Sequence, residues 1–361
     1  MDAEIHAIEK NQTWELTDLP VDKRSIGVKW VYKTKYKPSG EIDHFKVRLV
    51  AKGYKQKLGT NAWYKKIDSY FVQNSFQRCS FEHTLYIKSV EPNDILIVCL
   101  YIDDLIFTNS NPKIIAKFRE VMIKCFEMTN LGLMSYFLGI EVVQQDDEIF
   151  IFQKKYAVDI LKKFKMENSK PISTPVEEKL KLKKDSDERR IDSTYYKNLI
   201  RSLRYLTATR LDIVFGVGLL SRFMEEPRAC HLQGAKRILR YIKDTLTEGT
   251  FCANNFNIKL VGYTDSDWAG DIVTRKSTSG YTFHLGTGAV SWSSKKQPRI
   301  ALSIADAEYI AVTSCATQAI WIKRMLKAMY QKQDPHIVIF CDNKSAIALS
   351  KNLAFHGGLS T

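Results

Sequence analysis

Alternation of polar and apolar positions marks the first organised segment of the chain. Basic residues recur at most alternate positions from 29 to 37, and residues 44–52 alternate in the same way after Pro38-Ser39-Gly40. A period of two residues is typical of β-strands, and Pro-Ser-Gly is typical of a turn. We therefore predict a hairpin over residues 29–52 with one apolar face and one basic face. Its candidate nucleic-acid-binding residues are Lys33, Lys35, Lys46, Arg48 and Lys52.

The aromatic residues of this segment share the apolar face. Trp30, Tyr32 and Tyr36 alternate with the lysines, and such rings can stack on nucleic-acid bases. The return strand has an apolar face of its own, however, so burial of these rings in a core is the favoured interpretation.

Helical and strand-like patterns alternate through the middle of the chain. The apolar run 95–108 is interrupted only by Asp103-Asp104, which predicts two buried strands joined at a tip. Residues 177–190 are charged without apolar periodicity and are predicted to form a linker. The other predictions are a helix that opens at residue 61, helices over 112–127, 154–164, 195–224 and 231–243, and a hairpin around 144–148.

The last third of the chain changes to a strand-rich rhythm. Ser303 precedes a long helical pattern and Asp306 follows three residues later, a variant of the capping box that starts helices. The order of the elements predicts a mixed sheet covered by helices, and the fold class of the chain is α/β (α+β). The predicted elements are strands at 259–264, 279–285 and 289–293, a helix at 304–329, a buried strand at 337–341 and a helix at 343–350.

The length and composition of the chain bear on the number of domains and on the kind of partner. A chain of 361 residues exceeds one compact core and predicts two or three domains. Lys and Arg number 54 against 40 Asp and Glu, and the formal net charge of +14 points to a polyanionic partner such as nucleic acid. A basic protein without such a partner is the alternative that charge alone leaves open.

Cysteine spacing and the lack of long apolar runs narrow the class further. The seven cysteines form no Cys-x-x-Cys pair, which argues against a zinc ribbon and for reduced, mostly buried thiols. The first residues contain no apolar signal segment, and the longest apolar run, 95–102, is too short to span a bilayer. We expect an intracellular protein, in cytoplasm or nucleus, without a membrane partner. The oligomeric state is left open.

Two acids at the tip of the apolar hairpin form the first candidate site. Asp103 and Asp104 stand between the runs ILIVCLYI and LIFT. Aspartate is common in turns, so a plain turn is the alternative. Rigid apolar strands would instead hold two like charges at a fixed position, where a pair of divalent cations is the natural partner.

Three acids far apart in the sequence form the second candidate site. Asp265 lies at the end of a predicted strand, Glu308 in the first turn of the long helix, and Asp342 at the end of the next strand. Taken singly, each acid is a cap or a surface charge. If they converge where sheet and helix meet, they can hold two magnesium ions that activate a water for phosphodiester hydrolysis.

Runs along nearly the whole chain resemble copia-type retrotransposon Pol polyproteins. NQTWELTDLP, IGVKWVYKTKY and GEIDHFKVRLVAKGY are similar to the fingers of their reverse transcriptases, and YIDDLIFT is similar to the palm motif. LGIEV, IFIFQKKYAVDILKKF and YYKNLIRSLRYLTATRLDIVFGVGLLSRFM resemble the segment that leads to ribonuclease H. VGYTDSDWAGD, RKSTSGYTFHLGTGAVSWSSKKQP, ADAEYIA and IFCDNKSAI resemble the ribonuclease H domain.

The resemblance implies roles for the candidate residues. Asp103 and Asp104 correspond to palm carboxylates that bind catalytic metals, and Asp265, Glu308 and Asp342 correspond to three of the four ribonuclease H acids. The basic hairpin resembles finger residues that contact template or incoming nucleotide. The implied activity is that of an RNA-directed DNA polymerase with ribonuclease activity on RNA/DNA hybrids. RNA, DNA and their hybrid are the implied partners, and Mg²⁺ or Mn²⁺ is the implied cofactor, which hard oxygen ligands favour over zinc.

The resemblance also divides the chain and exposes two departures from the family. Residues 1–170 would be a reverse-transcriptase remnant, 171–254 a linker with a helical connection, and 255–361 a ribonuclease H-like domain. The family has a long palm segment, with the first polymerase aspartate, where this chain has an immediate junction at 60/61. Asp68 and Glu82 lie where the family has other structure, so neither replaces that acid.

The second departure is at the C-terminus, where the sequence stops before the fourth ribonuclease H position. We therefore expect an internally deleted and C-terminally truncated fragment with an inactive polymerase and a weak or inactive ribonuclease H. A non-catalytic remnant that binds nucleic acid through the basic hairpin is the competing hypothesis. A chain that does not fold as a unit is the third.

Overall fold

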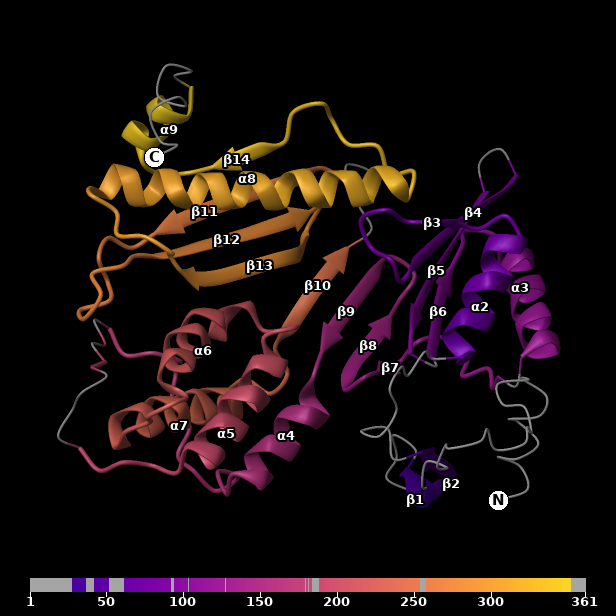
Figure 1. Cartoon of the computed structure of the whole chain (residues 1–361), viewed down its shortest axis with the longest axis horizontal. Helices are drawn as coiled ribbons and strands as arrows, with labels where there is room; N and C mark the ends of the chain where they lie inside the picture. The colour runs from indigo at the N-terminus through magenta and orange to yellow at the C-terminus, as the bar shows by residue number, and fades with distance from the viewer. Residues whose placement is uncertain are drawn as a thin grey trace, which may run out of the picture. The chain divides into compact units, whose positions relative to one another are not determined.

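The structure, a computed structural model of the chain, is mixed in secondary structure (Figure 1). It describes residues 28–36, 42–51, 62–91, 94–102, 104–126, 128–178, 180, 182–183, 188–253 and 258–351, and mainly the backbone in the first hairpin. Two compact units comprise residues 1–132 with 328–330, and residues 133–327 with 331–361. The α+β class is confirmed, while the domain limits expected at residues 170 and 254 stay a prediction. Among the described residues, no helix is long and apolar enough to cross a membrane.

The predicted basic hairpin is present in the first unit. It consists of β1 (Val28–Tyr36) and β2 (Ile42–Ala51), paired antiparallel. Opposite residues of an antiparallel ladder share one face of the sheet. The register places Lys33 opposite Lys46, so basic positions of the two strands gather on one side of the hairpin.

Two details of this hairpin differ from the expectation or lie beyond it. Tyr32 is 67% exposed, so its expected burial in a core is wrong. The described part of this sheet has two strands only, and such a ribbon leaves its faces open. Lys52 lies outside the described residues.

An antiparallel sheet backed by two helices forms the rest of the first unit. Its elements are α2 (Ala62–Gln73), β3 (Gln77–Arg78), β4 (Leu85–Glu91), β5 (Asp94–Tyr101), β6 (Asp104–Thr108) and α3 (Pro112–Cys125). The strand order is β3-β4-β5-β6, and α2 and α3 cover one face (Figure 1). The two helices and the β5–β6 hairpin were predicted, whereas β3 and β4 were not.

Apolar side chains between these layers hold the β5–β6 hairpin in place. Phe71 of α2, Tyr86 of β4 and Phe126 after α3 are fully buried in one cluster. The start of α3 follows from its sequence, because the Asn111 side chain accepts the N–H of Lys113 and Pro112 occupies the first helical position.

The second unit opens with a four-stranded sheet and a group of helices. The sheet contains β7 (Tyr136–Phe137), β8 (Ile140–Gln144), β9 (Glu148–Phe152) and β10 (Gly249–Ala253), in the order β10-β9-β8-β7. The helices are α4 (Lys154–Lys163), α5 (Ser193–Leu206), η2 (Leu211–Ile213), α6 (Val214–Leu220), η3 (Ser221–Phe223) and α7 (Ala229–Asp244). The predicted helix over 195–224 is thus broken into four pieces.

The helices pack around an apolar core with one satisfied polar group at its centre. Leu199, Leu203 and Ile238 are completely buried there. Tyr196 is equally buried, and its hydroxyl donates to the carbonyl of Leu220 at 2.9 Å, which ties α5 to α6. Burial without that partner would cost about 1–3 kcal/mol.

The last part of the second unit is a mixed sheet with one long helix against it (Figure 1). Its elements are β11 (Leu260–Ser266), β12 (Thr278–Leu285), β13 (Gly288–Lys296), α8 (Ile304–Ala328), β14 (Val338–Phe340) and α9 (Lys344–Lys351). The strand order is β13-β12-β11-β14, with β14 parallel to β11 and the other pairs antiparallel. The predicted order of elements is confirmed.

Two sequence-based expectations about burial are wrong. β14 was expected to be buried, but Val338 and Phe340 are each 53% exposed, because this short strand lies at the edge of the sheet. The thiols were expected to be mostly buried, but only Cys79 and Cys315 are. Cys125, the last residue of α3, is exposed, and Cys99, Cys230, Cys252 and Cys341 are partly exposed.

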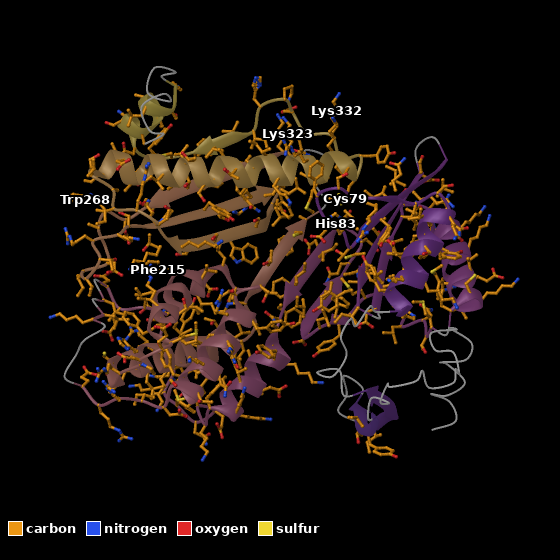
Figure 2. The ribbon with its side chains drawn as sticks, viewed as in Figure 1. Cys79, His83, Phe215, Trp268, Lys323 and Lys332 are labelled. Carbon is orange, nitrogen blue, oxygen red and sulfur yellow. The ribbon has the colours of Figure 1, made fainter. Side chains whose placement is uncertain are left out.

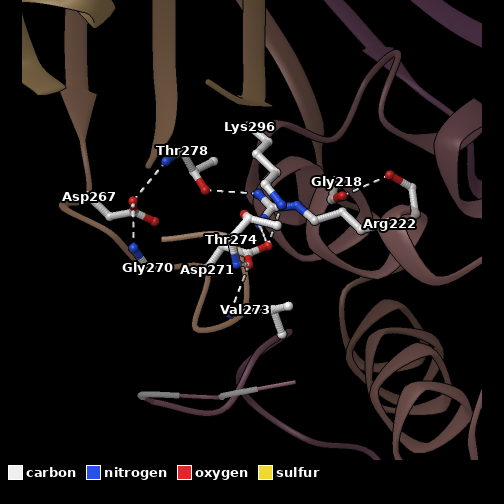
Figure 3. A network of polar contacts seen from close by, with 10 residues as sticks. Gly218, Arg222, Asp267, Gly270, Asp271, Val273, Thr274, Thr278 and Lys296 are labelled. Atoms are coloured by element: carbon white, nitrogen blue, oxygen red, sulfur yellow. Dashed lines mark hydrogen bonds and ion pairs between the residues drawn. The ribbon is translucent and has the colours of Figure 1, made fainter. Parts of the chain in front are cut away.

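An ion-pair network joins the helices to this sheet (Figure 3). Asp271, in the loop after β11, accepts from Lys296 of β13 at 2.6 Å and lies 3.6 Å from Arg222 of η3. Arg222 also donates to Thr278 of β12 at 2.8 Å. Burial alone would raise the pKa of the Asp271 carboxyl, but hydrogen bonds from Lys296 and Thr274 lower it to about 2. The Asp271 side chain is 14% exposed, so the pair is shielded from solvent.

Replacement of Asp271 by Asn should destabilise the second unit by about 1–2 kcal/mol at pH 7. Because the pKa of Asp271 is lower in the folded than in the unfolded chain, its stabilisation is complete above about pH 4. It is lost as the pH falls toward 2. Chemical denaturation followed by tryptophan fluorescence, at pH 7 and in steps down to pH 3, measures this difference.

Asp334→Asn is the matched control. Asp334 lies 3.5 Å from Lys259, but both side chains are more than 60% exposed, and such pairs contribute little. A wild-type advantage over Asp271→Asn that stays constant from pH 7 to pH 3 would contradict the assignment.

Candidate metal centre

The first candidate site, the tip between β5 and β6, is a tight turn. Tyr101 pairs with Asp104 across the hairpin, and Ile102 has a φ of +54°. A β-branched residue rarely adopts this left-handed conformation, so the tip is locally strained. Asp104 is exposed, and Asp103 lies outside the described residues. The structure therefore places Asp104 at the hairpin tip, as predicted.

Asp68 and Glu82, the acids that the sequence offers in place of the missing polymerase aspartate, are engaged in local contacts. Asp68 of α2 accepts the hydroxyl of Tyr86 at 2.5 Å and lies 3.7 Å from Arg78. Glu82 accepts both the N–H and the hydroxyl of Thr84, at 3.2 and 2.7 Å. These bonds explain their presence without a catalytic role.

The second candidate site brings three chain segments together. Asp265 is the last residue but one of β11, and Asp342 follows β14 by two residues. Because β11 and β14 are parallel, these acids lie at the same end of the sheet. Glu308 belongs to the second turn of α8, not the first as expected. The three predicted carboxylates do come close enough to interact.

Glu308 is the buried member of this cluster. It is 4% exposed, whereas Asp265 and Asp342 are exposed. Its Oε1 accepts the backbone N–H of Ser266 at 3.2 Å. Ligand atoms of Glu308, Cys341 and Asp342 all lie within 4.8 Å of one another, and the Cys341 thiol is 3.9 Å from Glu308 Oε2.

The electrostatics of the cluster favour a bound cation. Burial is the main cause that raises the pKa of Glu308, and the charges of Asp265 and Asp342 add to it. Together these effects bring the pKa to about 7, against the lowering effect of the Ser266 N–H. A divalent cation would remove the repulsion between these carboxylates, so the residues present fit such an ion.

The buried side chain of Gln297 connects the segments that carry Asp265 and Glu308, a role that was not predicted from the sequence. It is 3% exposed, and its side-chain N–H groups lie 3.1 Å from the hydroxyl of Ser266, 2.8 Å from that of Ser279 and 2.9 Å from the carbonyl of Ala307. The amide thus ties the residue after Asp265 to the residue before Glu308. Only the run SWSSKKQP, as part of the family resemblance, could have drawn attention to it.

Cys341 and Asp267 were also missed, for a different reason. Burial raises the pKa of the Cys341 thiol, a backbone hydrogen bond from Asn343 lowers it, and the neighbouring carboxylates raise it again. Cys341 therefore adds a thiol to a site whose other donors are hard oxygens. Asp267 accepts the N–H of Thr278 at 2.7 Å and shapes the loop that carries the half-exposed Trp268 (Figure 2). Neither contact could be read from spacing along the chain.

Comparison with known proteins identifies the first half of the chain. A family model described as reverse transcriptase (RNA-dependent DNA polymerase) matches residues 11–61 and, in a second piece, residues 58–178. The break between the pieces falls at the expected junction near residue 60. No solved structure matches the chain.

Transposon proteins match much more of the chain. The Retrovirus-related Pol polyprotein from transposon TNT 1-94 of Nicotiana tabacum is 31% identical over 99% of this chain, and that from transposon RE1 of Arabidopsis thaliana is 28% identical over 99%. This chain spans about a third of the length of each, 33% and 30%. A transposon Ty5-1 protein of Saccharomyces cerevisiae is 30% identical over 70% of this chain, which covers 82% of that protein.

The alignment with the tobacco polyprotein spans 443 positions, more than the 361 residues of this chain, so the relative contains segments that this chain lacks. The reverse-transcriptase match and the extent of similarity to these polyproteins lead to one conclusion. The chain belongs to the copia-type family of retrovirus-related Pol polyproteins from transposons.

Proposed function

We propose that Asp265, Glu308 and Asp342 form a ribonuclease H centre that cleaves the RNA strand of an RNA/DNA hybrid. The observation that carries the proposal is the convergence of three carboxylates from two parallel strands and a helix on one end of a mixed sheet. The strand order β13-β12-β11-β14, covered by α8, supports it. If Glu308 were an ordinary surface charge, it would be exposed. It is instead 4% exposed and lies close to two other acids.

The roles of the three acids follow from their exposure. Asp265 and Asp342 face solvent, so they are placed to share cations with a substrate phosphate. Glu308 is held by the Ser266 N–H and supplies a charge that cannot be hydrated from bulk water. Divalent cations bound there would activate a water and stabilise the leaving oxygen. We propose Mg²⁺ or Mn²⁺, because carboxylate oxygens favour them.

The polymerase half of the chain is proposed to be inactive. The reverse-transcriptase match breaks near residue 60, where the expected palm segment with its first aspartate is absent from the sequence. Asp68 and Glu82 bind Tyr86 and Thr84 and are not free to replace it. Within the described part of the chain, the only group of three or more candidate ligands is the one at Glu308.

A second candidate function is nucleic-acid binding by the first hairpin, independent of catalysis. The β1–β2 register that sets Lys33 opposite Lys46 favours it. Basic positions gathered on one face can neutralise several phosphates and release their counterions.

Primer extension on an RNA template should give no product above background, with either Mg²⁺ or Mn²⁺. Two catalytic cations need carboxylates from more than one strand to set their spacing. The comparison is between the wild type and Asp104→Asn. Extension by the wild type that disappears in the variant would refute the proposal.

Hydrolysis of a hybrid labelled on its RNA strand should be slow, should require divalent metal, and should fall at least about tenfold in each carboxylate variant. The variants are Asp265→Asn, Glu308→Gln and Asp342→Asn, and Glu225→Gln, an exposed acid outside the cluster, is the control. Binding of Mn²⁺, followed by electron paramagnetic resonance, should weaken in the same three variants. Equal cleavage by all five proteins would refute the ribonuclease H centre, and only the nucleic-acid-binding function would remain.

Affinity of the chain for single-stranded and hybrid oligonucleotides should fall steeply with salt. Removal of Lys33, Lys35 and Arg48 together, each replaced by Ala, should reduce the slope of log K against log salt by about two to three. The control replaces Lys113, Lys117 and Lys124, three exposed lysines of α3. A slope that the hairpin variant leaves unchanged counts against this function.

A further inference from the structure

A groove with a mixed polar and apolar lining lies within the second unit, between its helices and the edge strand β13. Its volume is about 720 Å³. α6 and η3 line one wall, β13 lines the other, and Arg204 and Ala208 at the end of α5 close one side. None of the residues of the carboxylate cluster lines it, so it is a separate feature of the surface.

Specific contacts fix the width of this groove. The indole N–H of Trp292 on β13 donates to the carbonyl of Thr207 at 2.8 Å. Gly218 of α6 lies so close to β13 that a Cβ there would be 3.2 Å from the carbonyl oxygen of Ser294. Arg222 and its bonds to Thr278 and Asp271 close the far end (Figure 3). The groove is therefore a built feature and not a gap between loosely packed parts.

The groove is positively charged, because Arg204, Arg222, Lys295 and Lys296 line it. Two of these cations, Arg204 and Lys295, have no ion-pair partner among the residues that the structure describes. Arg222 and Lys296 share Asp271 as their partner. The Arg204 side chain is exposed and makes no hydrogen bond or ion pair with any residue that the structure describes. The hydroxyl of Ser294 adds a further donor along the β13 wall. This combination suits an anion with many oxygens.

The position of the groove relates it to the carboxylates. Asp265 pairs with Gly280, and Gly280 pairs with Ser294, so the three residues form one row across β11, β12 and β13. Paired residues share a face, and Ser294 lies two strand spacings, roughly 10 Å, from Asp265. Gly280 lies between them and carries no side chain, so no side chain of that residue separates the carboxylate cluster from the groove.

We infer that this groove binds the sugar-phosphate backbone of the RNA/DNA hybrid beside the point of cleavage. The inference rests on the proposed ribonuclease H function and extends it, because it makes helices α5 and α6 part of the substrate-binding surface. An acidic protein segment would also suit the charge. The row from Asp265 to Ser294 favours the hybrid, since a strand lying at the carboxylates reaches the groove along it.

Three substitutions test this inference by the sign of their effect. Arg204→Gln removes one of the two unpaired cations, Ala208→Glu places an acid at an exposed position in the groove, and Ala208→Lys adds a cation there. Arg201→Gln is the matched control, because Arg201 is exposed on the same helix and does not line the groove. Thermal unfolding of each variant checks that the fold is retained.

Binding of a fluorescent RNA/DNA hybrid to the full chain is measured across salt with EDTA present, so that no cleavage occurs. Arg204→Gln and Ala208→Glu should weaken binding several-fold near 0.1 M salt, and the first should lower the salt slope by about one. Ala208→Lys should tighten binding, and Arg201→Gln should match the wild type. Unchanged affinity in Arg204→Gln and Ala208→Glu would overturn the inference.

Poly-glutamate of matched charge serves as the competing polyanion. Equal effects of the substitutions on hybrid and poly-glutamate would show a general anion surface and would overturn the specific assignment, as would an effect on poly-glutamate alone. Because binding is read without metal, its outcome is independent of the cleavage assay. Failure of cleavage would refute the nuclease centre, and failure of the binding series would refute the groove.

Discussion

The buried carboxylate of Glu308 is the constraint on which the rest of the second unit depends. A carboxylate at 4% exposure beside two other acids is unfavourable unless it holds a proton or shares a cation. The fold keeps it there by pairing β14 parallel to β11, which brings Asp265 and Asp342 to one end of the sheet. Gln297 then fixes the spacing, because one amide reaches both the strand end at Ser266 and the helix start at Ala307. A shared cation or a bound proton therefore stabilises a cluster of this kind.

The two acidic motifs differ in what surrounds them. The tip between β5 and β6 joins two apolar strands and has Ile102 in a strained conformation, and Asp68 and Glu82 elsewhere in this unit are satisfied by Tyr86 and Thr84. The cluster at Glu308 is the opposite case, because its donors are drawn from distant segments and repel one another. A motif of adjacent residues can therefore be recognised in the sequence, whereas the cluster at Glu308 exists only in the folded chain.

Local pattern was sufficient for most elements and insufficient for contacts. The hairpins and helices could be predicted because their apolar residues recur with a fixed period, as in α8 with its Ser303 cap, whose hydroxyl accepts the N–H of Asp306 at 3.1 Å. The return bond of that cap goes to the N–H of Leu302 instead of Ser303. β3 was missed because its two residues show no period, and it exists through its pairing with β4. β4 and β10 were also missed. The approach of Cys341 to Glu308 and the three bonds of Gln297 depend on tertiary packing that no spacing encodes.

The same reasoning bears on where one functional part ends and the next begins. Resemblance placed a boundary at residue 254, between a helical connection and a ribonuclease H-like domain. Physical contacts cross it repeatedly, because Arg222 binds Asp271, Trp292 binds Thr207, and Gly218 lies against Ser294. A partly buried ion pair and a close helix–strand contact are lost together if the two segments separate. The helices are thus part of the surface on which the carboxylates lie, and the smallest piece that presents this surface intact must include α5, α6 and η3.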